Sequence, residues 1–194
     1  MIRRLLLILS LLFHVFSLLN AQDVKQHSVA LIPYPVTLVE GEGAFVFSEK
    51  TVVALEDKEL EPIARDFVEL FTEPAGFTPK LKVKSKKGEV YLMKDDSFQE
   101  EGYALEVTPE KIVVKAAGVK GAFYALQTLR QLLPSDIEGN ECKPDVIWKV
   151  PSVRVTDEPR FGYRGLMVDV ARYFITKEHI MWLIDTMGML KLNK

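Results

Sequence analysis

Residues 163–190 read YRGLMVDVARYFITKEHIMWLIDTMGML, and this stretch decides the fold of the C-terminal part of the chain. Residues 163–170 form a nearly continuous apolar run, which is typical of a strand buried on both faces in a parallel sheet. Thr176 is a favourable N-cap, and Glu178 suits the first turn of the helix that follows. That helix runs to about Leu190 and gathers its apolar side chains on one face. A buried strand, a short loop and an amphipathic helix predict the first step of a parallel α/β fold.

One such step cannot complete a fold, because its strand needs neighbouring strands and its sheet needs helices on both faces. The sequence given ends at Lys194, shortly after the helix. We therefore expect residues 161–194 to be the start of a domain whose remainder lies outside this chain. We also expect residues 160–194 to be disordered by themselves, because their apolar strand has no partner.

The chain upstream of this step follows a different pattern. Residues 103–107 and 112–114 alternate apolar and polar side chains around a turn, which predicts a β-hairpin. Residues 60–72 and 121–133 have helical periodicity instead. Residues 31–150 therefore predict an α+β domain, an antiparallel-rich sheet with two helices on one face.

The N-terminus predicts export from the cell. Two arginines precede an apolar run of about 15 residues, Leu5–Leu19, and the small Ala21 comes before polar residues. This is the layout of a secretory signal peptide over residues 1–21, followed by a tail over residues 22–30. An uncleaved anchor is the alternative, although the run is shorter than the roughly 20 residues that span a bilayer. We expect a periplasmic, cell-surface or extracellular protein with no membrane span after cleavage.

Composition excludes several classes of site. The 25 Lys and Arg against 27 Asp and Glu give a net charge of −2, without the basic excess of a nucleic-acid binder. The single cysteine, Cys142, rules out an intramolecular disulfide and a cysteine-rich zinc site. We expect Cys142 to be a small, buried or partly buried residue. The three histidines disfavour a metal centre built from several histidines.

Three stretches resemble glycoside hydrolase family 20, the β-N-acetylhexosaminidases. IPYPVTLVEGEGAFVF, at residues 32–47, resembles the opening of the family's non-catalytic α+β domain. EGYALEVTPEKIVVKAAGVKGAFYALQTLRQLLP, at residues 101–134, resembles the closing hairpin and helix of that domain. PRFGYRGLMVDVARYFITKEHIMWLIDTMGMLKLN, at residues 159–193, resembles the first strand and helix of the family's (β/α)8 TIM barrel.

The resemblance implies a domain organisation and a reaction. Residues 31–150 would be the non-catalytic domain, residues 151–160 a connector and residues 161–194 the start of the barrel. The family removes terminal N-acetylglucosamine or N-acetylgalactosamine from glycans with retention, and the substrate's own acetamido oxygen is the nucleophile. An adjacent Asp-Glu pair supplies the acid/base and orients the acetamido group. No metal ion and no organic cofactor is implied.

One residue of the sugar site is carried over from the resemblance. Arg172 matches the family's arginine after the first barrel strand, which binds hydroxyls of the terminal sugar. The position agrees with physical expectation, because barrel active sites lie at the C-terminal ends of strands and a guanidinium donates to two neighbouring hydroxyls. Arg164 matches the family too, but it lies at the start of the strand, where a structural role is expected. Asp169 either orients Arg172 or holds a neighbouring loop.

The catalytic Asp-Glu pair of the family has no counterpart in this sequence. The pair Asp157-Glu158 lies in the predicted connector, upstream of the barrel, so we expect the catalytic pair to lie beyond Lys194 and this chain alone to be inactive. Trp148 and Trp182 are expected to pack, Trp148 between the domains and Trp182 on the outer helix of the barrel, rather than to stack on sugars.

Two alternatives remain at this stage. A family 84 hexosaminidase or hyaluronidase shares the leading domain, but a Gly-Phe-Tyr-Gly-type turn is expected where residues 170–174 read VARYF. A carbohydrate-binding or assembly module without catalysis would need exposed aromatic side chains on the α+β sheet.

Overall fold

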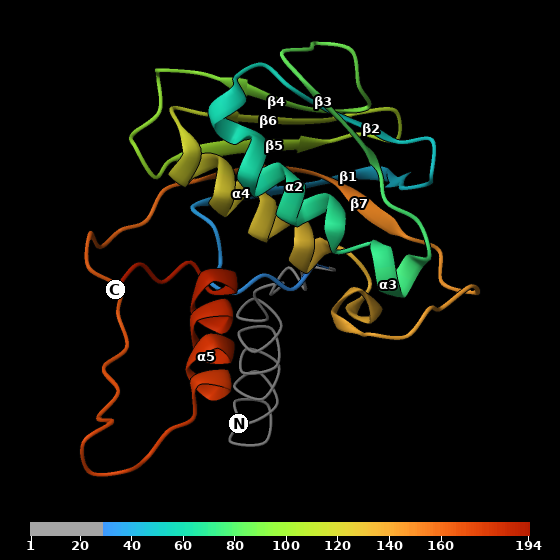
Figure 1. The fold of residues 1–194 in the computed structure, drawn as a ribbon. Coiled ribbons are helices and arrows are strands. Elements are labelled where there is room, and N and C mark those ends of the chain that lie inside the picture. Colours follow the sequence, from blue (N-terminus) through green and yellow to red (C-terminus); the bar gives the residue numbers. More distant parts are fainter. Residues whose placement is uncertain (1–28) are drawn as a thin grey trace, which may run out of the picture.

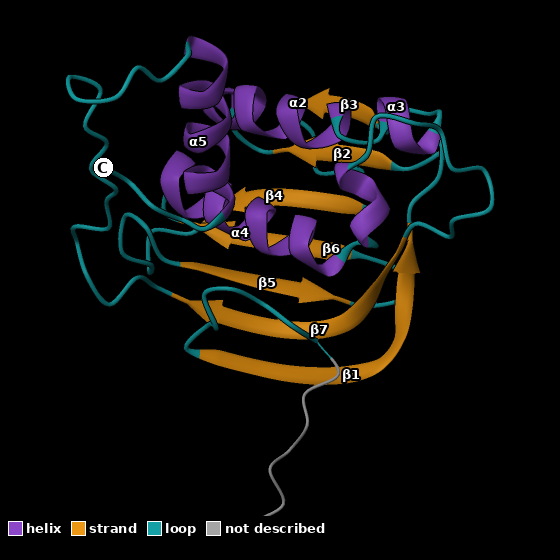
Figure 2. Ribbon diagram, turned by 90° about the horizontal axis from the view of Figure 1, so that it is seen from below, coloured by secondary structure: helices purple, strands orange, loops and turns teal. Residues whose placement is uncertain are grey.

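The computed structural model describes residues 29–194. The predicted signal peptide, residues 1–21, and nearly all of the predicted tail, residues 22–30, lie outside the described residues. The centre of the structure is a seven-stranded sheet in the order β1-β7-β5-β6-β4-β2-β3. Figures 1 and 2 show the helices α2 and α4 on one face of this sheet and α5 set apart from it.

The strands are β1 (Thr37–Val46), β2 (Val52–Leu55), β3 (Lys80–Val83), β4 (Val90–Lys94), β5 (Tyr103–Val107), β6 (Ile112–Ala116) and β7 (Lys149–Asp157). The helices are α2 (Glu61–Glu69), α3 (Thr72–Ala75), α4 (Val119–Leu132) and α5 (Lys177–Met189), with 3₁₀ turns η1 (Lys58–Leu60) and η2 (Ser135–Glu138).

The sheet has two halves with different strand directions. The pairs β1·β7, β7·β5 and β5·β6 are antiparallel, and the pairs β6·β4, β4·β2 and β2·β3 are parallel. The parallel half arises because α2 and α3 carry the chain from β2 back to the start of β3. The α+β class is confirmed, as are the hairpin β5–β6 and the two long helices on one face, and the sheet is mixed.

The core between the sheet and the helices is rich in aromatic rings. Phe71 is fully buried, and its ring centroid lies 4.8 Å from that of Phe47 and 5.8 Å from that of Phe67. Trp148, only 4% exposed, packs edge-on against Phe71 at 6.2 Å. Trp148 therefore packs, but inside the α+β domain and not between two domains. Cys142, expected to be at least partly buried, is exposed in the loop after η2.

The connector expected over residues 151–160 is mostly a strand. Residues 149–157 form β7, which lies between β1 and β5 in the antiparallel half of the sheet. Pro151 is tolerated because it stands opposite Ala44, at the irregular register that begins after Glu40. The α+β domain therefore extends past residue 150, to the end of β7.

The barrel strand expected over residues 163–170 is absent from the structure. These residues form no strand, and several large side chains are exposed, up to 83% for Met167. A strand needs hydrogen-bonding partners on a neighbouring strand, and within residues 29–194 no strand pairs with this segment. The helix that follows is confirmed as α5, and its N-cap Thr176 accepts a hydrogen bond from the His179 amide.

None of the helices in residues 29–194 combines the length and the apolarity that crossing a membrane would require.

Candidate functional site

Arg172 lies in the loop between residues 163–170 and α5, where its side chain is 83% exposed. Its guanidinium Nε lies 3.2 Å from Oδ2 of Asp169. The other oxygen of Asp169 accepts hydrogen bonds from the backbone amides of Ala171, at 2.9 Å, and Arg172, at 3.2 Å. Asp169 therefore shapes the turn and orients Arg172 at the same time, and the remaining guanidinium N–H groups of Arg172 face solvent.

The loop of Arg172 and the helix after it expose large apolar side chains. Tyr173 is 77% exposed, Phe174 is 91% exposed, and Trp182 on α5 is 59% exposed. Trp182 was expected to pack, but among the described residues its only ring contact is His179, 5.5 Å away. Exposed apolar side chains in this number are typical of a surface that another part of a protein covers.

Arg164 joins the C-terminal segment to the α+β domain, as its expected structural role requires. Its guanidinium donates to Oε2 of Glu101 at 2.9 Å and to the hydroxyl of Tyr124 at 2.8 Å. It also donates to the backbone carbonyls of Phe161, at 2.6 Å, and Lys191, at 2.8 Å. The hydrogen bond from Arg164 holds the pKa of Glu101 below its usual range.

Lys191, three residues from the C-terminal end of the sequence given, is buried inside the α+β domain. Its Nζ donates to the hydroxyl of Tyr103 at 2.8 Å and to Oδ2 of Asp157 at 2.9 Å. The second oxygen of Asp157 accepts from the Val36 amide, and Tyr103 shares a 2.6 Å hydrogen bond with Thr128. Burial lowers the pKa of Lys191 and raises the pKa of Tyr103.

Asn193 is the third residue, after Arg164 and Lys191, that joins the C-terminal segment to the α+β domain. Its Nδ2 donates to Oε1 of Glu101 at 3.2 Å, and its Oδ1 accepts from the Arg164 amide at 3.0 Å. Backbone hydrogen bonds link Asn193 to Arg164 and Leu166 to Lys194. These hydrogen bonds tie the C-terminal segment to the α+β domain, and its disorder in isolation stays a prediction.

We call this set of contacts the polar junction. It comprises Arg164, Lys191 and Asn193 from the C-terminal segment, and Glu101, Tyr103, Tyr124 and Asp157 from the α+β domain. Sequence reasoning missed Lys191 and Asn193 entirely. No local signal marks them, because Lys191 meets partners that lie 34 and 88 residues away along the chain.

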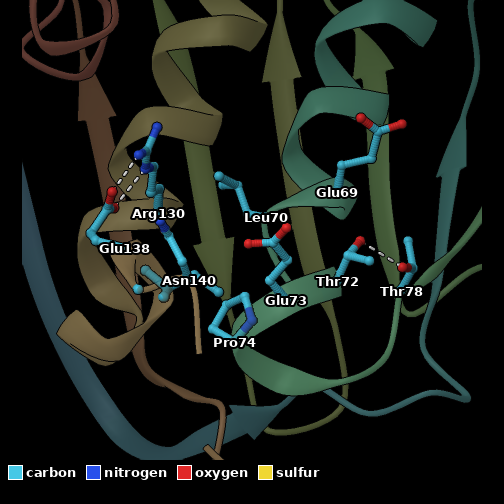
Figure 3. Close-up of a pocket in the computed structure, with 11 residues that line it drawn as sticks. Glu69, Leu70, Thr72, Glu73, Pro74, Thr78, Arg130, Glu138 and Asn140 are labelled. Carbon is cyan, nitrogen blue, oxygen red and sulfur yellow. Dashed lines mark hydrogen bonds and ion pairs between the residues drawn. The ribbon is translucent and has the colours of Figure 1, made fainter. Parts of the chain in front are cut away.

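A cavity of about 640 Å³ lies elsewhere, between the end of α2, α3 and η2 (Figure 3). Arg130 in its wall is already paired with Glu138, and Thr72 is hydrogen-bonded to Thr78. No aromatic ring lines it, and no residue of the segment 161–194 reaches it. Among residues 29–194, no three His, Cys, Asp or Glu side chains are grouped so that they could hold a metal ion.

Comparisons with known proteins agree with this architecture and identify the class of protein. The family model described as "Glycosyl hydrolase family 20, domain 2" matches residues 28–158, and the model described as "Glycosyl hydrolase family 20, catalytic domain" matches residues 161–194. The first match covers most of the chain and includes β7. The chain belongs to glycoside hydrolase family 20, and family 84 is set aside.

Individual relatives are hexosaminidases. The chain is 34% identical over 172 residues to a beta-hexosaminidase of Porphyromonas gingivalis, a match that covers 86% of this chain and 22% of that protein. It is 30% identical over 192 residues to an N,N'-diacetylchitobiase of Vibrio harveyi, covering 91% of this chain and 18% of that protein. The chain thus spans less than a quarter of the length of these two relatives.

Solved structures give the same result. The N-acetyl-beta-hexosaminidase of Streptomyces plicatus, in complex with thio-NAglucal, superimposes with a TM-score of 0.78 at 27% sequence identity. This match covers 84% of the present chain and 33% of the Streptomyces chain.

Proposed function

We propose that this chain is the N-terminal part of a β-N-acetylhexosaminidase that removes terminal N-acetylglucosamine or N-acetylgalactosamine from glycans. The observation that carries the proposal is the match of residues 161–194 to the family's catalytic domain, directly after the match of residues 28–158 to its domain 2. Three similar proteins, from Porphyromonas, Vibrio and Cellulomonas fimi, are hexosaminidases or chitobiases by name. The glycoside hydrolase class follows from the family, and the particular substrate is the proposed part.

In this proposal Arg172 binds the terminal sugar. Its guanidinium can donate two parallel hydrogen bonds to neighbouring hydroxyls, and Asp169 presets its direction through the 3.2 Å contact. Reaction by the substrate's own acetamido group needs no carboxylate nucleophile from the protein, unlike the retaining mechanism with two carboxylates. It still needs an acid/base, and the carboxylate beside Arg172, that of Asp169, is already occupied by the Arg172 guanidinium and two backbone amides. We therefore propose that the acid/base lies beyond Lys194 and that residues 1–194 alone do not hydrolyse the substrate.

Export through a signal peptide over residues 1–21 belongs to the same proposal. It is supported by the two arginines and the apolar run that follows them.

Sequencing of the source DNA past codon 194 tests the proposal. We expect the reading frame to continue into a second strand that bears a histidine and later into an adjacent Asp-Glu pair. A stop codon directly after Lys194 would contradict it, and the hydrolase identity would then describe ancestry and not activity.

A non-catalytic carbohydrate-binding or assembly module is the second candidate. Such a module would present aromatic side chains on the sheet, yet the exposed aromatics of residues 29–194 lie on no strand: they are Tyr34, Phe161, Tyr163, Tyr173, Phe174 and Trp182. A pull-down of the chain on immobilised glycans separates the two candidates, because retention by a chain without Arg172 would favour the module.

A further inference from the structure

Helix α5 packs loosely on the α+β domain. None of its residues is buried, although its hydrophobic content is high. Gly188 lies against α4, where an added Cβ would lie 3.3 Å from the ring of Phe123. Gln131 of α4 donates to the carbonyl of Met189 at 3.0 Å. Figure 1 shows α5 below α4 and away from the sheet, and since none of its residues is fully buried, apolar burial alone fixes the helix weakly.

The chain turns sharply after α5 and directs one side chain into the α+β domain. Lys191 has a φ of 59°, a left-handed conformation that is costly for a residue with a Cβ. Its amide bonds to the Gly188 carbonyl, and the next amide bonds to the Met187 carbonyl, which closes the end of the helix. The side chain is only 4% exposed. Such a conformation persists where surrounding contacts determine it.

The receiving site for Lys191 is built into the sheet itself. Tyr103 is the first residue of β5 and Asp157 is the last residue of β7, and the two stand directly opposite each other in the antiparallel ladder. Thr128 of α4 fixes the Tyr103 hydroxyl, and the Val36 amide fixes the second oxygen of Asp157. Both acceptors of the lysine are therefore held before Lys191 arrives.

From this geometry we infer that Lys191 is a positioning residue: it fixes α5, and with it the loop of Arg172, in one orientation on the α+β domain. Buried polar partners have few alternative arrangements, whereas an apolar interface can slide, so the lysine specifies the geometry. Arg164 and Asn193 secure the other end of the segment through Glu101. The inference deepens the proposed function and rests on it for the importance of Arg172.

Hydrogen exchange of the 194-residue chain, measured by peptide, tests the inference without any sugar. In Lys191→Met the side chain keeps its length and loses its charge and its donors. We expect peptides from residues 161–194 to exchange at least about tenfold faster than in the wild type, while peptides from β5 and β6 keep their rates. Lys177→Met is the matched control, because Lys177 begins the same helix and is exposed. It should exchange like the wild type.

Wild-type exchange of residues 161–194 in Lys191→Met would overturn the inference, as would equal acceleration in Lys177→Met. Lys191→Met also leaves Asp157 buried without its cation, so the sheet itself can open. Asn193→Ala then decides, since it leaves no buried charge: acceleration confined to residues 161–194 supports the junction, and no change overturns it. Full activity of an Arg172→Ala enzyme would refute the sugar-binding role and leave the exchange result standing.

Discussion

Substitution of Gly121 by alanine probes the close approach that builds the polar junction. Gly121 lies in the first turn of α4, where an added Cβ would lie 2.2 Å from the carbonyl oxygen of Gly102 and 3.1 Å from the Cβ of Ala116. Ordinary carbon–oxygen contacts are about 3.3–3.6 Å, so α4 would have to move by about 1 Å. The carbonyl belongs to the backbone just before β5 and cannot swing aside.

The magnitude follows from two opposing effects. Alanine is favoured over glycine within a helix by about 1 kcal/mol. Overpacking against backbone costs about 1–3 kcal/mol, and a 2.2 Å approach belongs at or above the upper end of that range. We therefore expect Gly121→Ala to lower the free energy of unfolding by about 2 kcal/mol. With a typical slope of about 2 kcal/mol per molar urea, the midpoint of denaturation falls by about 1 M.

Gly118→Ala is the control for this measurement. A Cβ on Gly118 meets nothing within 4 Å, and only the poorer N-cap quality of alanine counts against it, at about 0.5–1 kcal/mol. An unfolding midpoint in Gly121→Ala equal to that of the wild type would refute the claim that α4 is fixed against residue 102. Tyr124 of the polar junction, and Thr128, which is hydrogen-bonded to Tyr103 of the junction, would then owe their positions to other contacts.

Three further predictions concern charges. The hydrogen bond with Arg164 lowers the pKa of Glu101. The ionised Glu101 therefore stabilises the fold above the ordinary value of 4.5, and this stabilisation is lost as the pH falls through the lowered pKa. Urea titrations between pH 3 and 7 should show the loss in the wild type and not in Glu101→Gln. The lowered pKa of buried Lys191 has a consequence of the same sign at alkaline pH. Between that lowered value and the ordinary 10.5 the unfolded chain binds more protons, so stability should rise with pH, and Lys191→Met should remove this rise in urea titrations over that range. Arg172→Ala should change the free energy of unfolding by less than about 1 kcal/mol, because its ion pair is exposed, and thermal melts would contradict this with a drop of more than about 5 °C.

Local patterns explain which elements the sequence could predict. Apolar and polar side chains alternate in β5 and β6, and only a short turn separates these strands. A hairpin pairs strands that are adjacent in sequence, so this pairing could be predicted. The start of α5 was equally local, because Thr176 caps its own helix. The sequence indicates that residues 146–155 are extended, but it does not indicate that they form a strand of the α+β sheet. That placement depends on β1, which begins over a hundred residues earlier, and on the irregular register with β1 that tolerates Pro151.

In the candidate site, too, local contacts could be predicted from the sequence and long-range contacts could not. The Asp169–Arg172 contact spans three residues, and its orienting role was one of two local interpretations. Whether residues 163–170 form a strand depends on partners that these residues cannot specify themselves. The polar junction depends on contacts between residues up to 92 positions apart, and a lysine after a helix gives no sign of being buried.

The proposed activity is tested most directly by the hydrolysis of 4-nitrophenyl N-acetyl-β-D-glucosaminide. The assay compares the product of the whole reading frame that contains codons 1–194 with its Arg172→Ala variant. Loss of hydrogen bonds from a charged donor to the sugar costs about 1.5–3 kcal/mol, so we predict that the wild type hydrolyses the substrate and that kcat/KM falls about 10- to 150-fold in the variant, with an unchanged melting temperature. No hydrolysis by the wild-type product, or an equal kcat/KM in the variant, would contradict the account.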